Sequence, residues 1–347
     1  LYTVRLLEAL RELDDVEVVA FSDLAVAELA DVVVRRSRLP LFLWRQVVLP
    51  GLVREAGCTS FHSTVTAMSL RLAVPVVATI HDLSWRVVPE CYSWRDRLRQ
   101  WFWFRRASRG ADRLVAVSEA TRAAVVTRDP GLADRTAVVR SGAIAARLPP
   151  PDPAERRAAL GRFGIGGRFV LAVGRVERRK NPVSVIRAFA SATERRDLSD
   201  VQLVFAGPAG NAQAEAAETA RRLGIAGRVV FCSYVGDELA QLYDAAELLV
   251  YASLDEGFGH PPFEALSLGT PVVASDIPVI REVLDGGGEL VPLDRPGALA
   301  DAIRRVLSDS AFRADLLARG RKRLGAFSWR ATAEGIAQLH RRLAEAG

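Results

Sequence analysis

The stretch Val170-Leu171-Ala172-Val173-Gly174-Arg175, followed shortly by Lys180-Asn181-Pro182, decides the fold of this chain. Its apolar residues predict a buried strand, and Gly174 then allows the backbone to turn or to approach a ligand closely. Asn181 and Pro182 predict the N-cap and the first position of a helix. A buried strand, a glycine turn and a helix in this order are typical of one unit of a parallel α/β sheet.

The same alternation of strands and helices extends through the rest of the chain. Further strands are predicted at residues 16–20, 74–80, 114–117, 137–139, 202–205, 229–232, 248–252, 272–274 and 289–291. Near-continuous apolar strands of this kind indicate parallel sheets that are covered by helices on both faces. We therefore expect an α/β fold with two Rossmann-like, doubly wound domains that face each other across a ligand cleft.

The expected domain boundary follows from a shift in composition. A proline-rich stretch at residues 149–153 interrupts the alternation and predicts a linker. We assign residues 1–148 to an N-terminal domain and residues 149–326 to a C-terminal domain. The chain opens with leucines at helical spacing over residues 2–13 and not with a strand. We therefore expect that the first strand of the N-terminal domain and its glycine loop are missing.

Composition and charge narrow the class of protein. Of the 347 residues, 50% are hydrophobic and 25% are charged, which excludes a disordered chain. The three cysteines are far apart and predict neither a disulfide framework nor a zinc site. No apolar stretch is long enough to span a bilayer and no signal peptide is visible, so we expect a cytoplasmic protein. The net charge of +6 comes from arginines interspersed with acidic residues, and we expect no nucleic-acid partner.

The loop that follows the strand at 169–173 has the residues of a phosphate site. Arg175 and Lys180 lie close to the predicted helix N-terminus, where free N–H groups and the helix dipole favour an anion. The alternative is a solvated arginine loop. On either interpretation we expect Arg178 and Arg179 to face solvent.

A second motif follows the predicted strand at 248–252 and reads Glu256-Gly257-Phe258-Gly259-His260-Pro261-Pro262-Phe263-Glu264. Backbone amides around Phe258 and Gly259 could point at a ligand, as in other loops that cradle phosphates. We place Glu264 in the first turn of a short helix, whose N-terminus favours the ionised carboxylate. Both glutamates can accept hydrogen bonds from sugar hydroxyls. Helix capping by either glutamate is the alternative.

Together these motifs resemble those of the family 4 retaining glycosyltransferases. Members of this family have two Rossmann-like domains in the arrangement called GT-B. The most specific features are Glu256 and Glu264, with seven residues between them, and Gly174-Arg175 with Lys180-Asn181-Pro182. The resemblance extends over essentially the whole chain. It implies that residues 327–347 form a helix that crosses back to the N-terminal domain.

The resemblance also implies roles for the residues of the C-terminal domain. Arg175 and Lys180 would hold the diphosphate of a nucleotide sugar, and Glu264 would bind the ribose hydroxyls. Glu256 would bind the donor sugar together with the amides of Phe258 and Gly259. The donor-binding residues would be Gly174, Tyr234, Val235, Phe258, Gly259 and Glu264, together with Ser118 of the N-terminal domain. Tyr234 and Val235 would contact the base of the nucleotide.

In the N-terminal domain, His81-Asp82 follows the predicted strand at 74–80 and resembles the acceptor-side motif of the family. A structural role for His81 is the alternative, and Asp82 could orient the ring or cap the next turn. Ser118 resembles the serine near the donor phosphate in the family, but a plain helix N-cap explains it equally well. Of the other histidines, His62 is expected to follow a weaker strand and His340 to lie in the terminal helix. The predicted catalytic residues are His81, Asp82, Arg175, Lys180 and Glu256.

Residues 94–109 combine tryptophans with many arginines. Such a helix could lie on an anionic membrane surface and present a lipid-linked acceptor. The interpretation that we favour is a helix that packs its aromatic rings on the core while its arginines extend into solvent.

The function that the resemblance implies is the transfer of a hexose from a nucleotide-diphosphate sugar to a hydroxyl, with retention of configuration. GDP-mannose is the expected donor, because the stretch His81-Asp82-Leu83-Ser84-Trp85 and the following Pro89-Glu90 most resemble the bacterial mannosyltransferase-type members of the family. The acceptor could be a glycan, a lipid-linked molecule or a small molecule, and the reaction could take place at the inner face of the membrane. We expect a front-face mechanism without a metal ion or cofactor, because the basic residues can neutralise the diphosphate. A non-catalytic nucleotide-sugar-binding regulatory subunit and a nucleotide-sugar isomerase or hydrolase are the alternatives.

Overall fold

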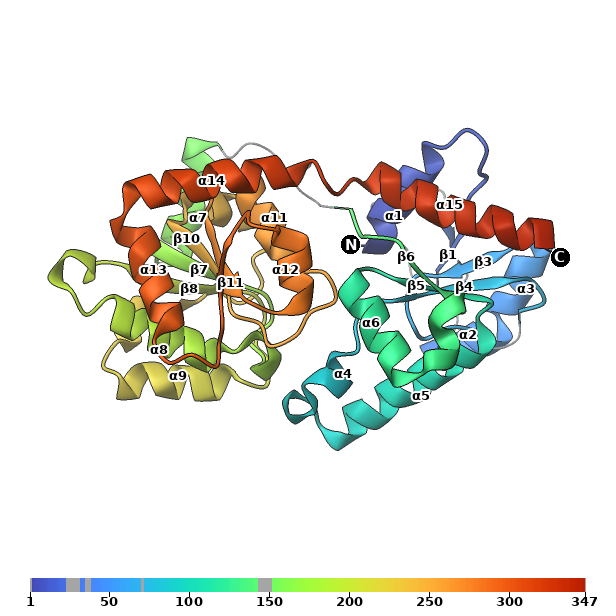
Figure 1. Ribbon diagram of the computed structural model, residues 1–347, viewed down its shortest axis with the longest axis horizontal. Helices are drawn as coiled ribbons and strands as arrows, with labels where there is room; N and C mark the ends of the chain where they lie inside the picture. The colour runs from blue at the N-terminus through green and yellow to red at the C-terminus, as the bar shows by residue number, and fades with distance from the viewer. Residues whose placement is uncertain (1, 23–31, 35–38, 70–71, 143–151, 347) are drawn as a thin grey trace. The chain divides into compact units, whose positions relative to one another are not determined.

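A computed structural model describes residues 2–22, 32–34, 39–69, 72–142 and 152–346. The chain forms two compact units (Figure 1). Unit 1 contains Leu1–Gly142 and Phe327–Gly347, and unit 2 contains Ala143–Ala326. The boundary that we predict between residues 148 and 149 falls in the segment 143–151, which lies outside the described residues.

Unit 1 is built on a parallel sheet with the strand order β3–β4–β5–β6. These strands are β3 (Phe61–Ser63), β4 (Val76–Ile80), β5 (Arg113–Ala116) and β6 (Thr136–Val138). A separate parallel pair consists of β1 (Ala20–Ser22) and β2 (Val32–Val34). The described helices of the unit are α1 (Tyr2–Arg11), α2 (Leu41–Val47), α3 (Leu49–Glu55), α4 (Ser84–Val87), α5 (Trp94–Gly110), α6 (Glu119–Arg128) and α15 (Trp329–Ala346).

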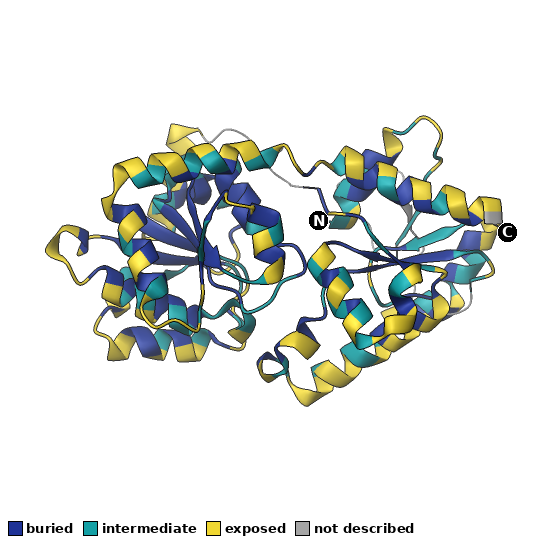
Figure 2. Cartoon of the chain, in the orientation of Figure 1, coloured by how far each residue is buried: buried dark blue, intermediate teal, exposed yellow. Residues whose placement is uncertain are grey.

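The central strand β4 is buried along its whole length because helices cover both faces of the sheet (Figure 2). Val76, Ala78 and Ile80 point to one face and belong to a cluster with residues of α5 and α6. Val77 points to the other face and belongs to a cluster with residues of α1 and α15. Successive side chains of a strand point to opposite faces, so a strand between two helical layers must be apolar at every position.

Unit 2 contains a six-stranded parallel sheet with the order β12–β11–β10–β7–β8–β9. Its strands are β7 (Phe169–Val173), β8 (Gln202–Ala206), β9 (Val229–Phe231), β10 (Leu248–Tyr251), β11 (Val272–Ser275) and β12 (Glu289–Val291). Its helices are α7 (Pro153–Arg162), α8 (Pro182–Ala192), α9 (Gln213–Arg222), α10 (Leu239–Ala245), α11 (His260–Ser267), α12 (Pro278–Leu284), α13 (Ala298–Ser308) and α14 (Ser310–Leu324). Helices α8, α9 and α13 pack together in one layer (Figure 1), and α7 packs on α10.

The order of the strands locates a crevice in unit 2. From β7 the chain adds β8 and β9 on one side of the sheet, and then β10, β11 and β12 on the other side. The direction of winding therefore reverses between the adjacent strands β7 and β10. In open α/β sheets, ligands bind outside the carboxyl ends of the strands at such a reversal.

Most strand predictions are confirmed within one or two residues, and those for β7 and β12 match at both ends. Two details were wrong. The strand expected at 16–20 begins only at Ala20 and continues to Ser22. His62 lies within β3 and does not follow a strand. The chain begins with helix α1, as expected, and among the described residues no helix is long and apolar enough to cross a membrane.

Candidate donor-binding site

The loop after β7 is shaped by glycines that let two strand ends approach each other. Gly174 has a φ of +123°, which L side chains rarely adopt, and Gly207 follows β8 with a φ of +154°. A Cβ atom on Gly207 would lie 2.3 Å from the carbonyl oxygen of Gly174. The loops after β7 and β8 can therefore pack together only because a residue without a side chain stands at this contact.

Lys180 meets residues from the end of the neighbouring strand β10. Its Nζ donates to the hydroxyl of Tyr251 at 2.8 Å and to Oε1 of Glu256 at 2.5 Å. The ammonium also lies 4.5 Å from the centre of the Tyr251 ring. Residues from the two sequence motifs are thus in direct contact, at the point where the winding of the sheet reverses.

Arg179 corrects a prediction, because it does not face solvent. Its side chain is 15% exposed and forms an ion pair with Oε2 of Glu256 at 2.7 Å. The same guanidinium donates to the carbonyl oxygen of Asp255 at 2.8 Å and to Oε1 of Glu177 at 3.0 Å. Arg178 does extend into solvent, with 58% of its side chain exposed. Both arginines lie in the three-residue 3₁₀ turn Arg178–Lys180, and Arg179 is the one whose side chain contacts Glu256.

Glu256 is held as a carboxylate by its two cationic partners. Burial by itself would raise the pKa of this group, but Lys180 and Arg179 outweigh burial and lower the pKa to about 2. Glu256 is therefore ionised at neutral pH, although its side chain is only 10% exposed. A fixed carboxylate in a crevice can accept hydrogen bonds from hydroxyl groups of a ligand.

Glu264 has the opposite environment. Helix α11 begins at His260, so Glu264 lies beyond the first turn and not within it as predicted. Its carboxyl is buried and accepts a hydrogen bond of 2.6 Å from the hydroxyl of Tyr243. Burial raises the pKa of Glu264, while Tyr243 and Lys180 partly offset this effect. The expectation that the helix N-terminus would favour the ionised form is therefore wrong, because burial dominates.

Other predicted residues of unit 2 lie around this cluster. Arg175 is exposed and donates to the carbonyl oxygen of Ala209 at 3.2 Å. Gly259 has a φ of +92°, and a Cβ atom there would lie 2.7 Å from Cδ1 of Ile280. Asn181 occupies the N-cap position of α8, as predicted, in a left-handed conformation and without a capping hydrogen bond from its side chain.

The expected base-reading segment follows β9. Ser233 has a φ of +58°, and the backbone turn there leaves the side chain of Tyr234 79% exposed, while Val235 is buried. Gly207 and Ser233 form an isolated antiparallel bridge, so this segment is tied to the loop after β8. Phe258 is buried and packs on Phe263 at a ring distance of 5.9 Å.

The predicted site residues of unit 1, His81, Asp82 and Ser118, make contacts within that unit. Nε2 of His81 lies 2.8 Å from the carbonyl oxygen of Thr64, and the ring meets the edge of Tyr2. Burial lowers the pKa of His81. Oδ1 of Asp82 accepts from the backbone N–H of Ser84 at 3.0 Å, which is the capping geometry. Ser118 is fully buried, and its hydroxyl accepts from the backbone N–H of Thr121 as the N-cap of α6.

The comparisons with known proteins cover both units. Residues 1–147 match the family model described as Glycosyltransferase Family 4, and residues 162–323 match the one described as Glycosyl transferases group 1. Together the two matches extend over most of the chain. The chain belongs to the family 4 glycosyltransferases of GT-B type.

One relative of this chain is the D-inositol 3-phosphate glycosyltransferase of Salinispora arenicola. The two are 34% identical over 244 residues, which are 66% of this chain and 54% of the relative. The chain thus spans about half the length of the curated relatives that it matches.

Solved structures have the same fold. Anabaena HepE in complex with UDP is 25% identical, with a TM-score of 0.62 over 77% of this chain and 72% of that chain. The lipopolysaccharide glycosyltransferase WaaG is 17% identical, with a TM-score of 0.73 over 97% and 94% of the two chains, and shows the fold alone.

Three residues that contribute to this site were not identified from the sequence. Tyr251, the last residue of β10, supports Lys180, and Tyr243 of α10 donates to Glu264. Arg179 was assigned to solvent. Tyr251 left a usable signal, because a polar group at the carboxyl end of a buried strand reaches the crevice. Tyr243 and Arg179 left none, because only tertiary packing brings them to their carboxylates.

A small cavity of about 20 Å³ is lined by residues that include Gly174, Lys180 and Tyr251. Lys180 at its edge contacts both Tyr251 and Glu256. Across the described residues, no three His, Cys, Asp or Glu side chains are grouped so as to hold a metal ion.

Proposed function

We propose that the chain is a retaining glycosyltransferase that moves a hexose from a nucleotide-diphosphate sugar to an acceptor hydroxyl. The observation that carries this proposal is the contact between Lys180 and Glu256 at the winding reversal of the unit 2 sheet. In this proposal Lys180 is the cation for the diphosphate, and the neighbouring Glu256 accepts hydrogen bonds from sugar hydroxyls. Family membership of both units supports the same activity.

The chemistry requires stabilisation of the departing diphosphate. As the bond between the sugar and the phosphate breaks, negative charge grows on the phosphate oxygens, and preorganised cations stabilise it. Lys180 can exchange Glu256 for a phosphate oxygen, since Arg179 remains as a partner of Glu256. Arg175 is exposed at the same loop and adds a second cation.

In this proposal the reaction needs no metal ion. The cations at the loop after β7 neutralise the diphosphate, which is the role of a divalent ion in metal-dependent transferases. We expect the same turnover with a chelator and with added magnesium. Activity that appears only with magnesium would contradict this part of the proposal.

The donor and the acceptor define the first panel of substrates. From the sequence we propose mannose, carried by GDP, and UDP-sugars must be tested beside it because HepE was solved with UDP. The name of the Salinispora relative supports a phosphorylated polyol as the first acceptor to test. Glycan and lipid-linked acceptors form the rest of the panel. His81 and Asp82 are proposed to act on the acceptor side.

The decisive experiment compares the only two lysines of the chain, Lys180 and Lys322. With the best donor, Lys180→Ala should reduce kcat at least tenfold, since removal of one group that stabilises a developing oxyanion costs about 2–4 kcal/mol. Lys322→Ala removes the same charge from an exposed position of α14 and should leave kcat unchanged. Equal turnover in both variants would overturn the diphosphate assignment.

The remaining alternatives give different products. Nuclear magnetic resonance of the product should show the same anomeric configuration as the donor sugar. Inversion of the anomeric configuration would contradict the proposal that the enzyme retains it. Donor binding without transfer to any acceptor or to water would indicate a regulatory subunit. Product that forms without an acceptor would indicate an isomerase or a hydrolase.

A further inference from the structure

The outer face of helix α5 has an unusual composition. At roughly 100° per residue, about 140° of its circumference holds eight side chains and no acidic one. These side chains are Trp94, Arg95, Leu98, Arg99, Phe102, Arg105, Arg106 and Arg109. The inner face is held to unit 1 by Phe104, Ala107 and Ser108, which are all buried.

The apolar members of this face form an exposed stripe. Trp94, Leu98 and Phe102 follow one another at intervals of four residues and are 67%, 55% and 37% exposed. Phe42 of α2 is also exposed and lies 5.8 Å from the ring of Trp103, so the apolar surface continues onto α2. The favoured interpretation from sequence, that the aromatic rings of this helix pack on the core, is therefore wrong for Trp94 and Phe102.

The exposed large apolar side chains are concentrated in unit 1. Among the described residues, the exposed large hydrophobic side chains lie in unit 1, apart from Leu223 and Tyr234. Contiguous apolar patches of this kind mark surfaces for binding, whereas scattered single residues need no explanation. The core of unit 1 does not bury Trp94, Leu98 or Phe102, so these side chains are available to contact a partner.

The arginines of the same face stay close to the rings. The guanidinium of Arg95 lies 5.3 Å from the ring of Trp94, and that of Arg106 lies 5.2 Å from the ring of Phe102. Asp96, the acidic residue of α5, lies off this face and is paired with Arg99. The guanidinium groups therefore lie against the aromatic rings of the apolar stripe. This arrangement suits a partner that has both anionic groups and hydrocarbon.

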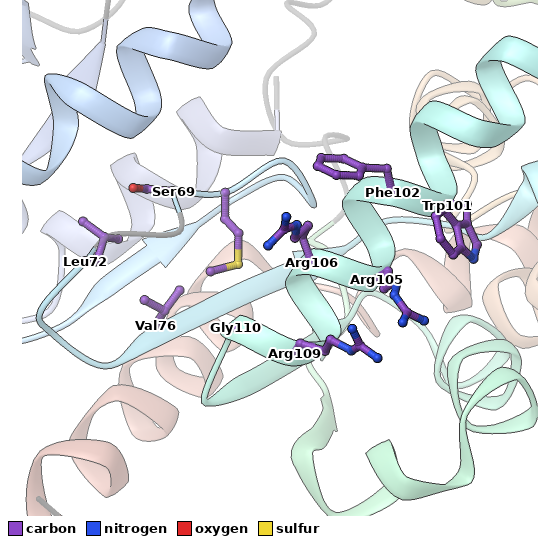
Figure 3. Close-up of a pocket in the computed structure, with 10 residues that line it drawn as sticks. Ser69, Leu72, Val76, Trp101, Phe102, Arg105, Arg106, Arg109 and Gly110 are labelled. Atoms are coloured by element: carbon purple, nitrogen blue, oxygen red, sulfur yellow. The ribbon is translucent and has the colours of Figure 1, made fainter.

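A cavity opens beside the C-terminal half of α5 (Figure 3). Its volume is about 520 Å³, and Met68, Leu72 and Val76 supply its apolar lining. Arg106 and Arg109 of α5 also line the cavity, and Figure 3 shows both on the helix side of it. The cavity thus offers apolar contact and cationic contact in one place, as does the stripe.

We infer that the outer face of α5 and this cavity form a docking surface for a bilayer that contains anionic lipids. The arginines contact the phosphate groups of the lipids, while Trp94, Leu98 and Phe102 enter the interface between headgroups and acyl chains. Nucleic acid would satisfy the arginines but would leave the aliphatic Leu98 and the apolar cavity without a partner. This inference does not depend on glycosyl transfer, because binding to vesicles is measured without any substrate.

The electrostatic part is tested by co-sedimentation with vesicles of phosphatidylcholine, with and without phosphatidylglycerol. The protein should bind only the vesicles that contain phosphatidylglycerol. Replacing both Arg106 and Arg109 by Gln should weaken this binding more than tenfold, since each arginine near an anionic surface contributes about fivefold. The matched control replaces Arg195 and Arg196, two exposed arginines of unit 2, by Gln and should bind as the parent does.

The apolar part is tested by the pair Leu98→Ser and Phe102→Ser, which removes no charge. Vesicle binding should fall at least tenfold, and lipids brominated on their acyl chains should quench the fluorescence of the parent but much less that of Trp94→Phe. Thermal unfolding midpoints close to the parent value would show that each variant is folded, because these side chains are exposed.

Three results would overturn the inference. The first is absence of binding to anionic vesicles. The second is binding that the serine pair leaves unchanged, because the surface would then be a charge patch for any polyanion. The third is equal loss in the control pair from unit 2, which would show that net charge alone governs binding.

Discussion

At the residue scale, the candidate site is a set of charges that compensate one another. Glu256 lies between Lys180 and Arg179, at 2.5 and 2.7 Å from their nitrogens. A carboxylate with one cationic partner would lose its compensation when that partner moved to a phosphate. With two partners, Lys180 can leave while Arg179 remains. The second cation therefore makes the first one available to a ligand.

Arg179→Gln tests this reasoning, and the neighbouring Arg178→Gln is its matched control. Loss of Arg179 should destabilise the protein by about 2 kcal/mol at pH 7, because a buried carboxylate loses a partner. Arg178 is 58% exposed, so its replacement should change stability by less than about 0.5 kcal/mol. Urea unfolding of the three proteins measures both effects, and equal stabilities would contradict the inward role of Arg179.

The same variant changes the response to acid. The pKa of Glu256 is lowered in the folded protein to about 2, so its contribution to stability is present above its ordinary pKa and is lost as the pH falls toward 2. In Arg179→Gln the pKa should be less depressed, which reduces the stability that this group contributes at neutral pH. The difference in stability between parent and variant should therefore shrink as the pH is lowered from 5 to 3.

Sequence reasoning at this scale identified residues that belong to local motifs. Gly174, Lys180 and Glu256 were found because a strand followed by a glycine loop directs backbone and side chains to one edge of a sheet. Arg179 and Arg178 are adjacent and identical in type, and only the tertiary contact with Glu256 distinguishes them. The environment of Glu264 was misjudged for the same reason, since its burial beside Tyr243 is not visible in the local sequence.

At the scale of elements, helix α15 joins unit 1 through a close backbone contact. A Cβ atom on Gly142, just after β6, would lie 2.6 Å from the backbone nitrogen of Trp329 and 2.5 Å from its ring. Gly142→Ala should therefore shift the start of α15 and destabilise unit 1 by about 1–3 kcal/mol. Gly51→Ala in α3, where a Cβ would meet nothing within 4 Å, should instead stabilise by about 0.5–1 kcal/mol. Chemical unfolding distinguishes the two signs.

The contact between α15 and β3 also contains two half-buried histidines. The rings of His62 and His340 lie 5.6 Å apart, and their nitrogens face the hydroxyls of Thr79 and Ser60. Burial lowers the pKa of His62 to about 3, with help from His340 and His81, and burial lowers the pKa of His340 to about 4. Both rings are therefore neutral in the folded protein at pH 7.

This pair predicts a loss of stability in weak acid. The unfolded chain takes up protons as the pH falls below about 6.5, while the folded protein does so only near pH 4 for His340 and pH 3 for His62. Stability should therefore fall between pH 7 and pH 5 by on the order of 1–2 kcal/mol for each histidine. His340→Gln should flatten the pH dependence over this range in urea unfolding. An unchanged slope would show that the histidines do not govern it.

Elements with strong patterns were predictable, and short ones were not. The strand β7 is apolar at every position and is followed by glycine, so both of its ends were found. The strand β3 contains only Phe61, His62 and Ser63. Two of these residues are polar, so the apolar pattern of the sequence does not indicate a strand here. The strand predicted at residues 16–20 ended where β1 begins. The position of β1 is set by its pairing with β2, which the apolar pattern of the sequence does not show.

At the scale of the whole molecule, the restart of the strand–helix alternation predicted two separate sheets. The structure has them, each with its own buried clusters. Folding in two units follows from chain length, because a single core rarely grows beyond about 250–300 residues. That residues 327–347 belong to unit 1 is not a consequence of strand pattern, and it came from the family resemblance.

A donor that binds unit 2 should stabilise the whole chain in a way that depends on Lys180. A nucleotide sugar at a hundredfold excess over its Kd raises the free energy of unfolding by about 2.7 kcal/mol. We expect this shift with a chelator present, and amide exchange should slow most in the segments 173–185 and 251–265. Lys180→Ala should abolish the shift at the same concentration, while Lys322→Ala should keep it. Protection that appears only in unit 1, or a shift that persists in Lys180→Ala, would place the donor elsewhere, because the cation and the glutamates of the crevice lie in unit 2 alone.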